Sequence, residues 1–213
     1  MKNIKIKKKG DEYYFPLDTS RAQLYQWMKE NRTKYHACHL MTINRDPKTL
    51  KNNQLSYVDA VEVALCFGWI DSTIRKVNGI PYRRFSPRKT KSHWTELNKE
   101  RCRRLINLRQ MTPEGRRVLP DLKSRFQEPL EIVKEIQKNK EAYCFFRQTP
   151  AFYQRIKLDN LSFTKERDDV QYQKSLKRFL EACQKHKLYG NFDDYGRLPV
   201  NFLTPEDTPH RSQ

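Results

Sequence analysis

The chain contains few glycines, few cysteines and no long apolar run, and each shortage excludes a class of protein. Six glycines in 213 residues leave no glycine-rich loop of the kind that cradles phosphates. The five cysteines are odd in number and include no Cys-x-x-Cys pair, which argues against a disulfide framework and a zinc site. Because no run of about 20 apolar residues is present, we expect no transmembrane helix.

Acidic residues are also scarce: 25 Asp and Glu stand against 43 Lys and Arg, a formal net charge of +18. The mean hydropathy is low, at −0.96. The chain nevertheless has 3 Trp, 11 Tyr and 11 Phe, and disordered chains are poor in aromatics, so the composition predicts a folded, basic protein. The first ten residues, MKNIKIKKKG, are positive but no apolar segment follows them, which does not fit a secretory signal. We therefore expect a cytoplasmic protein.

Local signals predict an α+β fold with a small, mostly antiparallel sheet and a helical C-terminal region. Four expected helices each follow an N-cap residue: Ser20 before 21–31, Ser56 before 57–66, Thr95 before 96–109, and Thr112 before Pro113. The expected strands are 35–43, 67–77 and 80–86. Asn78-Gly79 is a strong hairpin signal between the last two, and Pro81 suggests a sheet edge.

Three regions follow from these patterns. Residues 1–19 form a basic arm, in which Ile4 to Lys7 alternate as in a short edge strand or simply fray. Residues 20–125 form the α+β core. Residues 126–213 form a helical extension packed on that core, with helical periodicity at 129–139, 150–158 and 169–185.

Positive charge is concentrated in the hairpin, the loop after it and the next helix. Residues 75–117 hold 14 basic and 3 acidic residues, a net charge of +11, which leaves +7 for the other 170 residues. A field of one sign attracts anions, and a loop that feeds a helix N-terminus adds backbone N–H donors. The alternative is a solvated basic surface over buried tryptophans.

Particular residues in this region suit an anion site. Arg84, Arg88, Lys89 and Ser92 offer guanidinium, ammonium and hydroxyl donors for a phosphate or carboxylate. Trp69 and Trp94 can stack on a ring or cover an arginine. Asp71 can orient Arg75 or Arg84, act as a general base, or form a structural salt bridge, while Asn98 either caps its helix or contacts the ligand.

The sequence indicates no metal and no cofactor. His36, Cys38 and His39 lie close together, but on a strand His36 and Cys38 share one face and His39 points away, so the three do not easily meet one ion. Ser92 and Cys66 have no neighbouring base of the kind that activates a nucleophile.

Residues 57–115 resemble the YdeI/OmpD-associated family, whose bacterial members are also called bacteriocin-protection proteins. The resemblance rests on three segments: ALCFGWID at 64–71, RFSPR at 84–88 followed by SHWT at 92–95 and Asn98, and MTPEG at 111–115. Two positions depart from the family pattern, because Ser72 replaces a usual glycine and His93 a usual arginine. The resemblance implies an α+β domain and no particular reaction.

Three functions are compatible with these observations. The first is a binding module for a small anionic ligand, with or without a phosphate group, and with these contact residues: Trp69, Asp71, Arg75, Arg84, Arg88, Lys89, Ser92, Trp94 and Asn98. The second is non-specific nucleic-acid binding, which fits a pI of about 9.8 although no helix-turn-helix, zinc finger or RNP motif is present. The third is an enzyme of unknown reaction that uses Asp71 or His93.

Overall fold

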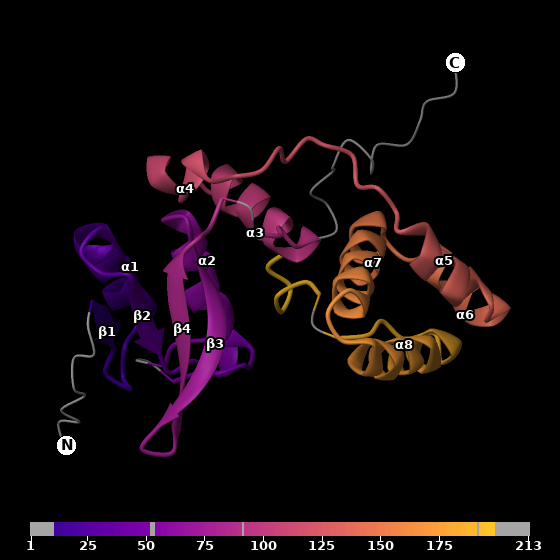
Figure 1. The fold of residues 1–213 in the computed structure, drawn as a ribbon, viewed down its shortest axis with the longest axis horizontal. Coiled ribbons are helices and arrows are strands. Elements are labelled where there is room, and N and C mark those ends of the chain that lie inside the picture. The colour runs from indigo at the N-terminus through magenta and orange to yellow at the C-terminus, as the bar shows by residue number, and fades with distance from the viewer. Residues whose placement is uncertain (1–10, 52–53, 91, 191, 199–213) are drawn as a thin grey trace. The chain divides into compact units, whose positions relative to one another are not determined.

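A computed structural model describes residues 11–51, 54–90, 92–190 and 192–198 (Figure 1). The chain forms two compact units. The first extends to His93 and includes Arg101–Pro120, and the second comprises Trp94–Glu100 and the chain from Asp121 onwards. The expected edge strand at Ile4 to Lys7 lies outside the described residues.

The first unit is built on a four-stranded sheet, which confirms the α+β class. Its strands are β1 (Glu12–Tyr14), β2 (Ala37–Leu40), β3 (Trp69–Val77) and β4 (Ile80–Pro87), in the order β1-β2-β4-β3. β4 is antiparallel to both β2 and β3, whereas β1 runs parallel to β2. The sheet is therefore mixed. The sequence predicted an edge strand within residues 1–19, at Ile4 to Lys7, but not the parallel strand at Glu12–Tyr14.

The hairpin between β3 and β4 forms where Asn78-Gly79 predicts it (Figure 1). Both turn residues have positive φ, 51° for Asn78 and 78° for Gly79, as the tight hairpin turn requires. Pro81 does not mark an edge strand, because β4 lies between β2 and β3. It is tolerated there because β2 pairs only with Arg83 to Phe85, so no ladder on that side needs the missing N–H.

Helices cover one face of this sheet. They are α1 (Arg21–Asn31), α2 (Tyr57–Cys66) and the short α4 (Pro113–Arg117), with a 3₁₀ turn η1 (Pro47–Thr49). Ser20, Ser56 and Thr112 each cap the helix that follows, as predicted. Trp27 of α1 packs against Tyr13 of β1 and edge-on against Trp69 of β3, with ring centroids 5.0 and 6.3 Å apart.

Helix α3 (Glu96–Asn107) supplies residues to both units, and its first turn belongs to the second. There Arg155 donates to Glu100 at 2.9 Å and lies 3.7 Å from Glu96, with all three side chains buried. The backbone N–H of Glu96 donates to Asp159 at 2.9 Å. These contacts attach Trp94–Glu100 to α7 (Ala151–Lys165).

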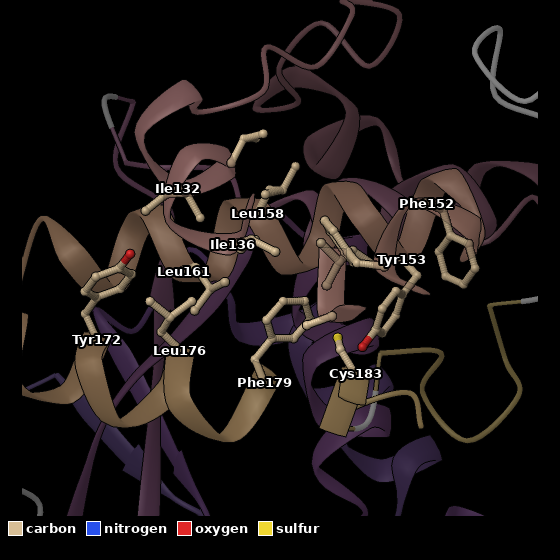
Figure 2. Packing of buried hydrophobic residues seen from close by; sticks show 14 residues of the cluster. Ile132, Ile136, Phe152, Tyr153, Leu158, Leu161, Tyr172, Leu176, Phe179 and Cys183 are labelled. Atoms are coloured by element: carbon tan, nitrogen blue, oxygen red, sulfur yellow. The ribbon is translucent and has the colours of Figure 1, made fainter. Parts of the chain in front are cut away.

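The second unit is helical, as expected. It contains α5 (Leu130–Gln137), α6 (Lys140–Gln148), α7 and α8 (Asp169–Gln184), packed around one apolar cluster that includes Ile136, Tyr153 and Phe179 (Figure 2). The sequence predictions did not include α6, although its two buried residues, Ala142 and Phe146, lie four positions apart, which is the spacing of one helix face. No helix in the described part of the chain has the length and hydropathy needed to cross a membrane.

Candidate functional site

Asp71, Arg83 and Tyr57 form a polar group where the hairpin meets α2. Arg83 Nη1 donates to Asp71 Oδ2 at 3.0 Å, and the Tyr57 hydroxyl donates to the same oxygen at 3.2 Å. The guanidinium carbon of Arg83 also lies 4.5 Å from the centroid of the Tyr57 ring, a cation–π contact. Burial and the charge of Asp71 raise the pKa of Tyr57, so the hydroxyl keeps its proton.

Strand register explains why Asp71 pairs with Arg83 and not with Arg75 or Arg84. Asp71 lies opposite Phe85, and Arg83 is two residues from Phe85 on the same face of β4. Arg84 points to the other face, because side chains alternate along a strand. Arg75 lies opposite Tyr82, beyond the irregularity between Asp71 and Ile74, and is exposed. The prediction that Asp71 orients Arg75 or Arg84 is therefore wrong, and its partner is Arg83.

Two buried arginines lie next to this group. Arg88 follows β4, is 9% exposed and donates to the backbone carbonyl of His93. Burial lowers the pKa of Arg88, while the charges of Cys102 and Asp71 act in the opposite direction. Arg101 of α3 is 4% exposed, and its guanidinium carbon lies 5.9 Å from the Tyr57 ring centroid. We call the five residues the Asp71 cluster: Tyr57, Asp71, Arg83, Arg88 and Arg101.

The Nε–H donor of Arg83 has no hydrogen-bond acceptor among the described residues. Its Nη1 is used by Asp71, but its Nε is buried and makes no hydrogen bond to any described residue. A guanidinium carries five N–H groups in a planar fork that matches the oxygens of phosphate or carboxylate. The cluster can therefore present a positioned guanidinium to an anion.

The other predicted ligand residues lie elsewhere. Trp69 is 2% exposed and packs in the core, so its ring has no free face for stacking on a ligand. Lys89 is exposed, and the Ser92 hydroxyl donates to the Lys89 carbonyl at 2.8 Å within a turn. Trp94 and Asn98 belong to the second unit, where the Asn98 N–H donates to the Thr95 hydroxyl at 3.2 Å in the predicted helix cap.

Arg84 belongs to a second polar group on the opposite face of the sheet. Glu12 accepts hydrogen bonds from Arg84 at 3.3 Å and from the fully buried His39 at 3.0 Å. The Tyr14 ring stacks on His39, with centroids 4.1 Å apart. Burial lowers the pKa of His39, aided by Arg84 and Arg75 and opposed by Glu12. No local pattern predicted this group, because its members come from three strands whose pairing depends on the tertiary structure.

No cluster of three or more His, Cys, Asp or Glu side chains suited to a metal occurs among the residues described. Cys38 and His39 are both buried and lie on opposite faces of β2, whereas His36 is exposed beside Asp11. His93 is exposed as well.

A family model for a domain of unknown function, DUF8412, matches residues 17–118. The matched segment contains the whole Asp71 cluster. No curated protein and no solved structure matches the chain.

Proposed function

We propose that the Asp71 cluster binds a small anionic ligand through a phosphate or carboxylate group. The observation that supports this most strongly is the state of Arg83. Asp71 and Tyr57 hold its guanidinium in place, and its buried Nε lacks a hydrogen-bond partner among the described residues. A buried donor without an acceptor costs free energy, and an anion supplies the acceptor.

The surroundings favour a negative ligand. Residues 75–117 carry a net charge of +11, and Arg88 and Arg101 contribute to the positive field at the cluster. The ligand would add a second anionic group to a site where Asp71 already orients one arginine. The resemblance to YdeI/OmpD-associated proteins stays a prediction and does not name the ligand, although Asp71 and Arg88 fall within its segments.

The test is a binding screen on the whole chain with inorganic phosphate, citrate, AMP, and short single- and double-stranded DNA. Melting temperature is measured at about 50 and 200 mM salt, since ligands that bind the folded state raise it. We expect one of the small anions to raise it at both salt concentrations, because partly buried donors are weakly screened. A shift with DNA alone that disappears at the higher salt would instead indicate a nucleic-acid surface.

Two variants separate a site from a diffuse field. Arg83→Gln and Arg75→Gln each remove one positive charge from the hairpin, but Arg75 is exposed and lies outside the cluster. Loss of a charge-assisted hydrogen bond costs about 1.5–3 kcal/mol, so Arg83→Gln should weaken binding of the small anion by about tenfold or more. Arg75→Gln should change it by less than about threefold. Equal losses in both variants would contradict the proposal.

A further inference from the structure

Lys157 is a lysine buried among aromatic rings in the second unit. Its side chain belongs to α7 and is 8% exposed. Its Nζ lies 5.2 Å from the ring centroid of Tyr153, 5.4 Å from that of Tyr189 and 5.9 Å from that of Phe192. Within the described ranges no carboxylate forms an ion pair with it. Buried lysines are rare without such a partner, because desolvating an ammonium is costly.

Among the residues that the structure describes, the titratable groups that face Lys157 Nζ are Tyr153, Tyr189 and Cys183. Burial lowers the pKa of Lys157 to about 8, and Cys183 of α8 acts in the opposite direction. Burial also raises the pKa of the Cys183 thiol to about 11, and that of Tyr153 to about 12, so both neighbours stay neutral near pH 8. Figure 2 shows Tyr153 and Cys183 on the apolar side of their helices.

The amine lies beside exposed backbone. A Cβ placed on Gly190 would be 3.3 Å from Lys157 Nζ, and Gly190 itself is exposed. Because glycine has no side chain, nothing from this residue covers the amine. The side of Gly190 is therefore where we expect a small reagent to reach the nitrogen.

We propose that Lys157 is a covalent modification site that accepts a small acyl group from an acyl thioester. The lone pair of the neutral amine attacks the thioester carbonyl carbon and forms the C–N bond. The C–S bond then breaks, the thiolate leaves with its electron pair, and the amine proton passes to the thiolate through water. The amide product is neutral, so no charge remains at a position that is largely removed from water.

The fraction of neutral amine distinguishes Lys157 from ordinary lysines. At pH 8 about half of an amine with a pKa of about 8 is neutral, against about 0.3% for a pKa of about 10.5. Restricted access and the lower basicity of the amine reduce this advantage, so we expect acylation at least about tenfold faster than at a surface lysine.

The matched comparison is Lys165, on the same helix. It is 35% exposed, and the hydrogen bond to Glu131 at 2.7 Å raises its pKa. The whole chain is treated at pH 7 to 10 with a limiting amount of S-acetyl-N-acetylcysteamine, and then with hydroxylamine to remove acetyl groups from cysteines. Peptide mass spectrometry gives the initial acetylation rate at each lysine. We expect the Lys157 rate to level off above about pH 8 to 9, while the Lys165 rate continues to rise.

A second pair of variants tests the environment directly. Gly190→Asp places a carboxylate near the amine, and Gly190→Asn adds a neutral side chain of the same shape. Asp and Asn tolerate the positive φ of 76° at this position better than other residues do. We expect the rate of Lys157 acetylation at pH 8 to be about tenfold lower in the Gly190→Asp variant than in the Gly190→Asn variant, because the added carboxylate favours the charged amine. The proposal is overturned if Lys157 of the native wild-type protein is acetylated no faster than Lys165. It is also overturned if Lys157 is acetylated only after the protein is unfolded in urea.

Discussion

Arg83 Nη1 lies 3.0 Å from Asp71 Oδ2, and this ion pair joins the two strands of the hairpin on the face that meets α2. The carboxylate orients the guanidinium and also lowers the local positive potential. A ligand anion bound at Arg83 would therefore be repelled by Asp71 while it gains from the fixed geometry.

Asp71→Asn separates these two effects. The amide oxygen can still accept from Arg83 and Tyr57, but the negative charge is gone. We expect affinity for the small anion found in the screen to rise several-fold, since a unit charge about 5 Å away contributes about 1 kcal/mol in a well-screened site. Calorimetric titration measures it, with Asp18→Asn as an exposed control of equal charge change. Weaker binding in Asp71→Asn would mean that orientation outweighs repulsion.

Glu62 holds α1, α2 and α3 together in the first unit. Its carboxylate is completely buried and accepts from Arg21 at 2.8 Å and from Arg104 at 2.5 Å. Burial lowers the pKa of Arg21, but Glu62 and Asp59 outweigh this effect and raise it. Glu62→Gln removes this charge from two partly exposed arginines, of which Arg21 keeps Asp59, and we expect the free energy of unfolding to fall by about 1–3 kcal/mol.

Urea denaturation measures this loss, and Glu114→Gln is the control. Glu114 pairs with Arg32 at 2.6 Å, but it is 35% exposed and water replaces the contact. The two variants should therefore differ clearly in denaturation midpoint. A Glu62→Gln midpoint as high as that of the control would show that the buried ion pairs add no stability.

His39 makes the stability of the first unit depend on pH. Burial holds its pKa below the ordinary value of 6.5, so the unfolded chain binds the proton first as pH falls. This contribution to stability is complete above about pH 6.5 and is lost as the pH drops towards the lower pKa of the folded state. Burial raises the pKa of Glu12, but hydrogen bonds from His39 and Arg84 outweigh this effect and lower the pKa below 4.5. Protonation of Glu12 therefore causes a further loss of stability below about pH 4.5.

Urea denaturation at pH 7.5, 6.5, 5.5 and 5 measures how the free energy of unfolding changes with pH. We expect His39→Gln to have a smaller loss of stability between pH 6.5 and 5 than wild type. His36→Gln is the control, because His36 is exposed, and it should keep the wild-type slope. The same slope in all three proteins would contradict a role for His39.

Gly115 is required by close packing. A Cβ at this position would lie 2.3 Å from the Cys66 carbonyl oxygen and 2.5 Å from Met111 Sδ. That carbonyl accepts from the Thr112 hydroxyl and backbone N–H, so it has little room to move. Gly115→Ala should cost about 3 kcal/mol of stability.

The comparison for this variant is Gly79→Asn at the hairpin turn, where nothing lies within 4 Å of an added Cβ and Asn tolerates the positive φ. Thermal unfolding should show a large loss for Gly115→Ala and a small one for Gly79→Asn. Equal melting temperatures would mean that α4 shifts to make room.

Local chemistry made much of the secondary structure predictable. Ser20, Ser56 and Thr112 mark helix starts because each hydroxyl accepts from an N–H that the helix leaves unpaired. Asn78-Gly79 marks the hairpin because few other residues adopt its backbone angles. Helix α6 was not predicted, although its two buried residues, Ala142 and Phe146, lie four positions apart as on one helix face; the bulky residues between them, Tyr143 to Phe145, make the segment read as one apolar run.

The candidate site was less predictable. The sequence indicated Asp71, Arg88 and a concentration of basic residues in the right region. It did not indicate Tyr57, Arg83 or Arg101, because their contacts depend on the register of β3 against β4 and on where α2 and α3 pack. Trp69 was expected at the ligand, but an indole beside Trp27 is more stable in the core.

The composition alone fixes the net charge of this protein, and residues close together in the chain set the starts of its helices and the position of its hairpin. The tertiary structure decided which arginine meets Asp71, which face His39 occupies, and that Lys157 lies among aromatic rings. These depend on pairing, alternation and burial between residues far apart in the chain, and burial sets the pKa of an amine that looks ordinary in sequence.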